Sequence, residues 1–252
     1  MLLVDIGNSR IKWAVSNDSE FRSIGEAEYV SKELGSQLDA MLCSVEKQAV
    51  VAVSSVASPR IVKAFSGWVE ERWQSEVLVV KTGKQQGKLL NGYVNPERLG
   101  VDRWLAMIAA TDEGRVGVPA CVIDCGSAIT IDVIGGDGQH LGGMITPGLS
   151  LMRNALVKGT RGIRLKDELP AEVSLLARDT EGAVIGGTLY AAVAMLDRVC
   201  GDIVVSTGCD TRFFITGGDA PTLIPLLDKE FEYDANLVLN GLLCVSRQMS
   251  EV

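Results

Sequence analysis

Val4-Asp5-Ile6-Gly7-Asn8-Ser9-Arg10-Ile11-Lys12, near the start of the chain, combines an apolar strand, a carboxylate, a glycine turn and a lysine. The same design returns in Val122-Ile123-Asp124-Cys125-Gly126-Ser127-Ala128-Ile129-Thr130-Ile131-Asp132, where Asp124-x-Gly126 repeats Asp5-x-Gly7. Two strand-turn-strand units with the same carboxylate and glycine predict two related halves that face a cleft.

The spacing of apolar residues predicts a similar order of elements around both units. The first half is expected to contain strands at 2–4, 11–15, 19–30, 49–53 and 77–80, and helices at 32–47 and 59–73. A helix at 102–111 leads to the second half, with strands at 121–125, 128–134, 140–145 and 213–216 and helices at 147–157, 181–199, 221–227 and from 236. This pattern predicts a duplicated α/β protein with halves 1–115 and 116–252.

The composition places further limits on function. With a net charge of −8 and a pI near 4.8, the chain lacks the basic character expected of a nucleic-acid-binding surface. Asp5 interrupts the first apolar run, so no secretion signal is predicted, and no run approaches ~18 uninterrupted apolar residues. We therefore expect a cytoplasmic protein without a nucleic-acid or membrane partner.

The cysteines and the histidine predict no metal centre. The six cysteines contain no CxxC pair, which favours buried free thiols in a reducing compartment. His140 is the one histidine of the chain and lies in a predicted hairpin strand. We expect it to be a surface or structural residue.

The two Asp-x-Gly turns have the groups that a phosphate site needs. Glycine lets backbone N–H groups approach anionic oxygens, a carboxylate can hold Mg²⁺ directly or through water, and a lysine can neutralise the transferring group. Asp5, Gly7 and Lys12 provide these in the first turn, and Ser127 and Thr130 add hydroxyls in the second. The alternative for each turn is an ordinary β-hairpin with a polar tip.

Two further stretches contain candidate residues for nucleotide binding or for catalysis. In Thr216-Gly217-Gly218, an apolar strand runs into a glycine turn and then a helix, which suits a base and ribose platform but also an ordinary strand-to-helix turn. Asp102 and Arg103 begin the predicted helix at 102–111. They are interpreted either as a base for a hydroxyl and a clamp for a carboxylate, or as a helix cap and a surface charge.

Two apparent motifs fail on inspection. Gly83-Lys84-Gln85-Gln86-Gly87-Lys88-Leu89 has three residues between its glycines where a P-loop has four, and Leu89 where Mg²⁺ needs a hydroxyl. We interpret it as a mobile basic loop. Ser9-Arg10-Ile11-Lys12 with Lys81-Thr82-Gly83 matches two of the three penicillin-binding signatures, but the Ser-Asp-Asn element is missing.

Taken together, the motifs resemble the type III pantothenate kinases, members of the acetate and sugar kinase, Hsp70 and actin superfamily. The resemblance covers nearly the whole chain and rests on five stretches in order: 5–12, Leu99-Gly100-Val101-Asp102-Arg103-Trp104, 124–132, Gly142-Gly143-Met144-Ile145-Thr146-Pro147-Gly148 and Thr216-Gly217-Gly218-Asp219-Ala220. It implies two ribonuclease H-like (actin-like ATPase) domains, with mixed sheets flanked by helices and the active site in the cleft between them. It also implies ATP-dependent phosphorylation of the primary hydroxyl of pantothenate to 4'-phosphopantothenate, the first step of coenzyme A biosynthesis.

The same resemblance implies roles for individual residues. Asp102 corresponds to the general base, and Asp124 to the ligand of a monovalent cation, K⁺ or NH₄⁺, which the family needs besides Mg²⁺. The residues implied in ATP and phosphate binding are Asp5, Ile6, Gly7, Asn8, Ser9, Arg10, Ile11, Lys12 and Ser127, with Asp5 also expected at Mg²⁺. Those implied in pantothenate binding are Tyr93, Gly100, Val101, Asp102, Arg103 and Thr180. The family forms homodimers with the substrate pocket near the interface.

One residue departs from the family pattern, since Ser127 stands where threonine is usual. Both hydroxyls reach a phosphate, so activity is expected to survive. Two alternatives remain open from the residues alone. One is a non-catalytic nucleotide-binding regulator of the transcriptional accessory type, and the other is a kinase of the same fold that acts on a sugar or a small carboxylic acid.

Overall fold

The computed structural model describes residues 1–17, 20–112, 117–165, 176–208 and 210–250. The chain forms two compact units. Unit 1 contains Met1–Arg115, Gly138–His140 and Asn236–Val252, and unit 2 contains Val116–Asp137 and Leu141–Ala235. The division into halves at 115/116 remains a prediction, because it falls in segment 113–116, outside the described residues.

Unit 1 is built on a five-stranded mixed sheet in the order β3-β2-β1-β4-β5. Its strands are β1 (Leu2–Ile6), β2 (Arg10–Asn17), β3 (Glu20–Glu28), β4 (Val50–Ser55) and β5 (Glu76–Val79). Strands β1 to β3 are antiparallel neighbours, whereas β4 runs parallel to both β1 and β5. The continuous apolar run of β4 is buried, as expected for a strand covered on both faces.

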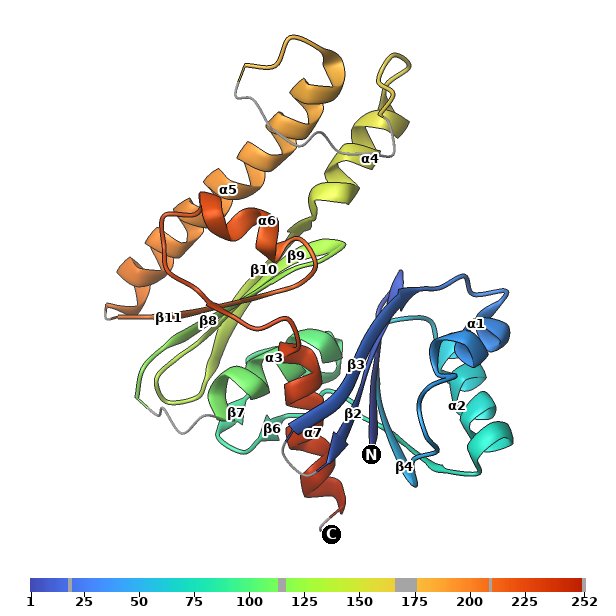
Figure 1. Cartoon of the computed structure of the whole chain (residues 1–252). Helices are drawn as coiled ribbons and strands as arrows, with labels where there is room; N and C mark the ends of the chain where they lie inside the picture. The colour runs from blue at the N-terminus through green and yellow to red at the C-terminus, as the bar shows by residue number, and fades with distance from the viewer. Residues whose placement is uncertain (18–19, 113–116, 166–175, 209, 251–252) are drawn as a thin grey trace. The chain divides into compact units, whose positions relative to one another are not determined.

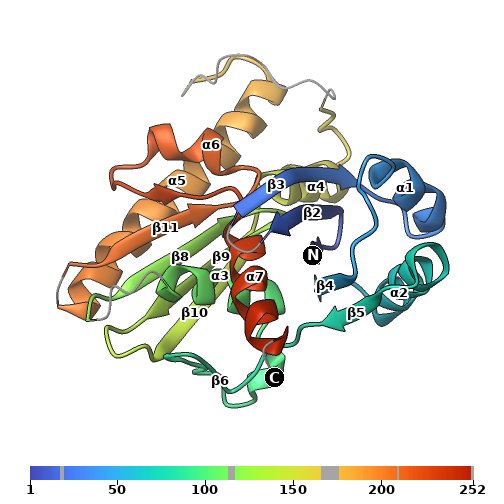
Figure 2. The same ribbon diagram turned by 60° about the horizontal axis from the view of Figure 1, so that its bottom comes forward.

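Helices cover both faces of this sheet (Figure 1). On one face, α1 (Leu34–Met41) and α2 (Pro59–Trp73) share a core with alternate residues of β1, among them Val4 and Ile6. On the other face lie α3 (Val101–Asp112) and α7 (Leu237–Ser250), which pack along each other (Figure 2). A side chain at Gly241 would collide with the Leu105 backbone, so glycine allows this close helix approach.

A short antiparallel hairpin, β6 (Gln85–Gln86) and β7 (Leu89–Leu90), completes unit 1, followed by the 3₁₀ helix η1 (Pro96–Arg98). The structure thus differs from the loop predicted for 83–89. Leu89 is fully buried, and this burial gives the hairpin an apolar anchor that the loop interpretation ignored.

Unit 2 repeats the strand order with β10-β9-β8-β11-β12. Its strands are β8 (Ala120–Cys125), β9 (Ala128–Ile134), β10 (His140–Pro147), β11 (Arg212–Thr216) and β12 (Glu232–Tyr233), and its helices are α4 (Leu149–Gly159), α5 (Thr180–Thr207), α6 (Ala220–Leu223) and the 3₁₀ helix η2 (Ile224–Leu226). The helix predicted at 221–227 is divided, because Pro225 lacks the N–H that would continue α6.

The repeat extends to the register of the sheets. Asp5 lies opposite Lys12 on β2 and beside Ser54 on β4. Asp124 takes the same place in unit 2, opposite Thr130 on β9 and beside Thr216 on β11. The predicted α/β fold with two mixed sheets flanked by helices is therefore confirmed.

Helix α5 is long and apolar enough to cross a membrane by length and composition alone. This is weak evidence for a membrane span, because core helices pass the same test. Residues along α5, including Leu189, Leu196 and Ile203, are buried in the core of unit 2. This packing favours a core helix.

The cysteines follow the prediction of buried free thiols in part. Cys121, Cys125 and Cys200 are buried and free, whereas Cys244 is only partly buried and Cys43 is exposed, which the prediction missed. The predicted helix at 32–47 ends at Met41 in the structure, so Cys43 lies after α1 and not within it. Cys209 lies outside the described residues.

Candidate active site

The first Asp-x-Gly turn joins β1 to β2 and is fixed by its backbone. The Gly7 N–H donates to the Arg10 carbonyl at 2.9 Å, and the Tyr29 hydroxyl donates to the Gly7 carbonyl at 2.9 Å. Asn8 and Ser9 at the tip are exposed. The turn therefore presents polar side chains to solvent on a fixed backbone, as a phosphate-binding turn requires.

Asp5 is oriented by the neighbouring parallel strand. The Ser54 hydroxyl, fully buried, donates to Asp5 Oδ1 at 2.8 Å. A buried hydroxyl bonded to a carboxylate fixes its direction. Sequence reasoning did not identify Ser54, although a Ser-Ser pair ending an apolar strand was visible at 54–55.

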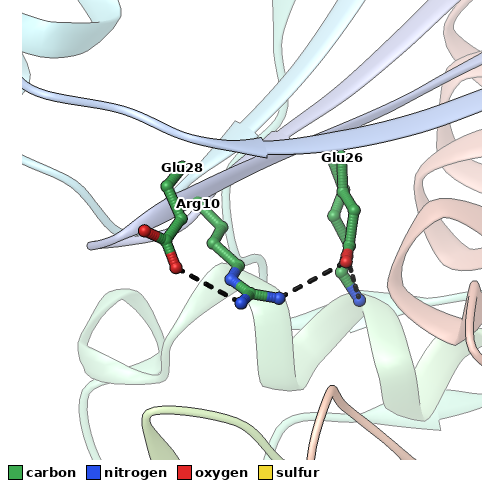
Figure 3. A network of polar contacts seen from close by, with 4 residues as sticks. Arg10, Glu26 and Glu28 are labelled. Carbon is green, nitrogen blue, oxygen red and sulfur yellow. Dashed lines mark hydrogen bonds and ion pairs between the residues drawn. The ribbon is translucent and has the colours of Figure 1, made fainter. Parts of the chain in front are cut away.

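Both cations of the first turn face carboxylates on β3, and Figure 3 shows Arg10 between Glu26 and Glu28. Arg10 lies 3.3 Å from both Glu26 and Glu28, and Lys12 lies 3.8 Å from Glu26. These are cross-strand pairs, because Arg10 is in register with Glu28 and Lys12 with Glu26. Sequence reasoning missed the two glutamates, whose signal was the alternating Glu-x-Glu of a strand beside β2.

The second Asp-x-Gly turn joins β8 to β9. The Gly126 N–H donates to the Ala128 carbonyl at 3.0 Å, and the Ser127 side chain is exposed. The Ser127 carbonyl accepts from the Gly148 N–H at 3.0 Å. The predicted phosphate-binding hydroxyl is thus free to face solvent on a turn whose backbone is fixed.

Two carboxylates lie near the end of β8. The Asp219 N–H donates to the Cys125 carbonyl at 2.9 Å, which attaches the 216–220 turn to the second Asp-x-Gly turn. Burial, with smaller contributions from Asp124 and Asp219, raises the pKa of the Cys125 thiol to about 12. The thiol is therefore protonated at neutral pH, which leaves the two carboxylates as the candidate ligands at this end of β8.

The donor atoms of these residues decide which cations they fit. Among the described residues, no group of three or more His, Cys, Asp or Glu side chains is placed to hold a metal ion. K⁺ and Mg²⁺ instead take oxygen ligands from carboxylates, carbonyls, waters and substrate phosphates. Asp124 at the second turn and Asp5 at the first provide such oxygens, so the residues present fit hard cations.

The predicted general base and its neighbouring pantothenate-binding residues lie at the start of α3. Asp102 is in the first turn of the helix, and its Oδ1 accepts from the Arg103 N–H at 2.8 Å. Arg103 is buried, with 6% of its surface exposed, so its interpretation as a surface charge is wrong. Arg103 Nη1 donates to the Tyr93 hydroxyl at 2.8 Å. Three residues predicted to bind pantothenate are thus brought together.

The segment before α3 is held by side-chain hydrogen bonds. Asn91 Nδ2 donates to the carbonyls of Gly83 at 2.9 Å and Pro96 at 3.2 Å, and Asn91 Oδ1 accepts from the Tyr93 N–H at 2.9 Å. Asn91 therefore fixes both ends of the loop that carries Tyr93. Sequence reasoning did not single it out.

Thr180 is the first residue of α5, in unit 2. Asp179 caps this helix by accepting from the Gly182 N–H at 2.8 Å. The predicted site residues are thus divided between the units. Unit 1 holds residues 5–12, Tyr93 and 100–103, and unit 2 holds Asp124, Ser127 and Thr180.

Comparison with known proteins identifies the family. The family model "Type III pantothenate kinase" matches residues 1–202. The chain is 38% identical to a type III pantothenate kinase from Nitrosococcus oceani, over 100% of this chain and 96% of that protein. It is 35% identical to a type III pantothenate kinase from Halorhodospira halophila, over 98% of this chain and 97% of that protein.

Solved structures with the same fold have low sequence identity. A Campylobacter jejuni protein described as a conserved Baf family transcriptional activator has a TM-score of 0.61 at 20% identity and full coverage of both chains. A ROK family glucokinase from Streptomyces griseus, in complex with glucose and AMPPNP, has a TM-score of 0.54 at 12% identity, over 98% of this chain and 99% of that chain. These likenesses show the fold alone, whereas the sequence matches decide the family. The chain belongs to the type III pantothenate kinases.

Proposed function

We propose that the protein phosphorylates pantothenate with ATP, using Asp102 as the base that accepts the proton of the primary hydroxyl. The activity is that of its family, as the names of its relatives state. The role of Asp102 is supported by its place in the first turn of α3, beside the buried Arg103. The hydroxyl oxygen attacks the γ-phosphorus, ADP leaves, and the proton moves to the Asp102 carboxylate.

Arg103 and Tyr93 are proposed to bind the carboxylate end of pantothenate. A guanidinium presents parallel N–H donors that match a carboxylate, and Arg103 is already oriented by the Tyr93 hydroxyl. Because this end of the substrate does not react, these contacts contribute to binding rather than to the chemical step. Gly100, Val101 and Thr180 are proposed to complete this subsite.

The two turns are proposed to hold the phosphates of ATP. In this proposal residues 5–12 contact the phosphates through backbone N–H groups and Lys12, and Ser127 contributes a hydroxyl. Asp5 would hold Mg²⁺, directly or through water, and Asp124 a monovalent cation. When bound, these cations neutralise charge that develops on the transferring group. A cytoplasmic homodimer is the proposed working form.

Asp102→Asn tests the proposed base. The substitution is expected to lower kcat by ~10²-fold or more, the usual scale for losing a general base. It should leave pantothenate affinity, measured by calorimetry, within about threefold of wild type, because the amide keeps the shape of the carboxylate. An ADP-release assay measures turnover with pantothenate and with a panel of sugars and small acids, each with and without potassium.

Three results would each contradict a part of the proposal. Unchanged turnover in Asp102→Asn would remove this residue from proton transfer. Turnover of the wild type with a sugar and none with pantothenate would replace the substrate. Equal rates with and without potassium would remove the monovalent cation from the reaction.

A further inference from the structure

His140 contacts Tyr93, a residue of the candidate pantothenate subsite. It is the first residue of β10, belongs to unit 1, and is 1% exposed. Its ring stacks on that of Tyr93, with centroids 5.8 Å apart and planes inclined by 12°. This separation and angle are those of an offset aromatic stack, which stabilises one ring position over others.

The backbone around His140 is tied to the segment that carries Tyr93. The Leu90 N–H donates to the Gly138 carbonyl at 3.0 Å. A side chain at Gly92 would collide with the His140 carbonyl, so glycine lets the two backbones touch. The position of His140 against this segment is therefore set by backbone contacts, independently of its ring.

Tyr93 is fixed at three points as a result. Its N–H donates to Asn91 Oδ1, its ring stacks on His140, and its hydroxyl accepts from Arg103 Nη1. The first contact fixes the backbone and the third fixes the ring tip. The stack and the Arg103 guanidinium, whose central carbon lies 5.7 Å from the ring centroid, restrain the ring plane, on which the position of the hydroxyl depends.

We propose that His140 is a positioning residue for pantothenate binding. Its ring holds Tyr93, and through the Tyr93 hydroxyl it holds the Arg103 guanidinium ready for the substrate carboxylate. The proposal rests on the function proposed above, in which Tyr93 and Arg103 bind that carboxylate. It assigns His140 no proton transfer, because the proposed role needs only a flat ring against Tyr93.

The test compares His140→Ala with His140→Phe. His140→Ala removes the stack and is expected to raise KM for pantothenate roughly 3- to 10-fold, the range expected for one aromatic pair. Turnover and KM for ATP should stay within about twofold of wild type, because Asp102 is held separately on α3. His140→Phe keeps a flat ring without a titratable group and is expected to restore the pantothenate KM to within about twofold.

Two controls separate positioning from a general loss of packing. Phe231 pairs with Phe213 in unit 2 at the same centroid distance of 5.8 Å, so Phe231→Leu removes an aromatic pair elsewhere and should leave the pantothenate KM unchanged. In a Tyr93→Leu background, His140→Ala should add no further increase, since the ring it supports is gone.

The outcomes distinguish this proposal from the proposed function. If the wild type fails to phosphorylate pantothenate, the proposed function fails, and positioning is then read from amide hydrogen exchange in 89–99. Faster exchange there in His140→Ala than in wild type and His140→Phe supports the positioning role, and equal exchange overturns it. With an active wild type, an unchanged pantothenate KM in His140→Ala overturns the proposal, and so does failure of His140→Phe to restore that KM. The proposal is also overturned if His140→Ala raises the pantothenate KM as much in the Tyr93→Leu background as in the wild type.

Discussion

At the scale of single residues, the charges around the first turn give a direct prediction. Arg10 and Lys12 are proposed to meet ATP phosphates, yet both face Glu26 on β3. Arg10 and Glu26 are about half exposed and Lys12 is less so, and exposed ion pairs contribute little to stability. Another anion can therefore readily replace the glutamate beside these cations. In the proposed function, Glu26 therefore competes with the nucleotide for Arg10 and Lys12.

Glu26→Gln should lower KM for ATP about 2- to 3-fold at low ionic strength, because the competing carboxylate is removed. The gain should shrink as salt is added, since exposed charges are screened. Initial rates at varied ATP and salt measure both effects. Glu46→Gln, an exposed glutamate in the same unit, changes the net charge equally and should have no effect. An unchanged or higher KM for Glu26→Gln would show that Lys12 and Arg10 do not meet the nucleotide.

At the scale of secondary-structure elements, the start of α5 links stability to the site. Asp179 caps the helix through the Gly182 N–H, and Thr180, proposed to bind pantothenate, is the first helical residue. A cap satisfies one of the unpaired N–H groups at a helix start, which stabilises the first turn. The direction of Thr180 thus depends on the cap.

Asp179→Ala should lower the free energy of unfolding by about 1 kcal/mol, the typical value of a cap, and raise KM for pantothenate. Asp179→Asn, which keeps an acceptor oxygen, should lose only a small part of this stability. Urea denaturation followed by circular dichroism measures the difference. Equal stability of the Ala and Asn variants would mean that the capping hydrogen bond has no energetic role.

The order of strands and helices is the part of the structure that the sequence predicted best. The order of strands and helices in both units follows from apolar periodicity, because most strands alternate or are buried continuously. The hairpin β6–β7 was missed, since two-residue strands leave no periodic pattern. Contacts between distant residues, such as Ser54 with Asp5 or His140 with Tyr93, depend on tertiary structure and have no local signal.

At the scale of the whole molecule, the pKa of the Cys125 thiol makes stability depend on pH. It is raised from 9.0 to about 12, chiefly by burial, whereas the unfolded chain has the ordinary value. The folded state therefore binds the proton more tightly. The stability that this provides is complete below pH ~9 and is lost as the pH rises towards ~12.

Cys125→Ala should accordingly show a shallower fall in the free energy of unfolding between pH 9 and 12 than the wild type. Denaturation at several pH values in this window measures the slopes. The exposed Cys43 serves as the control, and Cys43→Ala should keep the wild-type slope. Identical slopes for all three proteins would show that Cys125 titrates alike in both states.

The packing of α7 against α3 links the proposed base to the order of protein synthesis. Translation proceeds from the N-terminus, so the helix that carries Asp102 leaves the ribosome well before the segment that covers its apolar face. A nascent chain halted before Asn236 contains the strands of both sheets but lacks α7, the main partner of α3. The face of α3 that packs on α7 therefore stays uncovered until translation has passed Asn236, and exposed apolar surface of this kind makes a nascent chain prone to association.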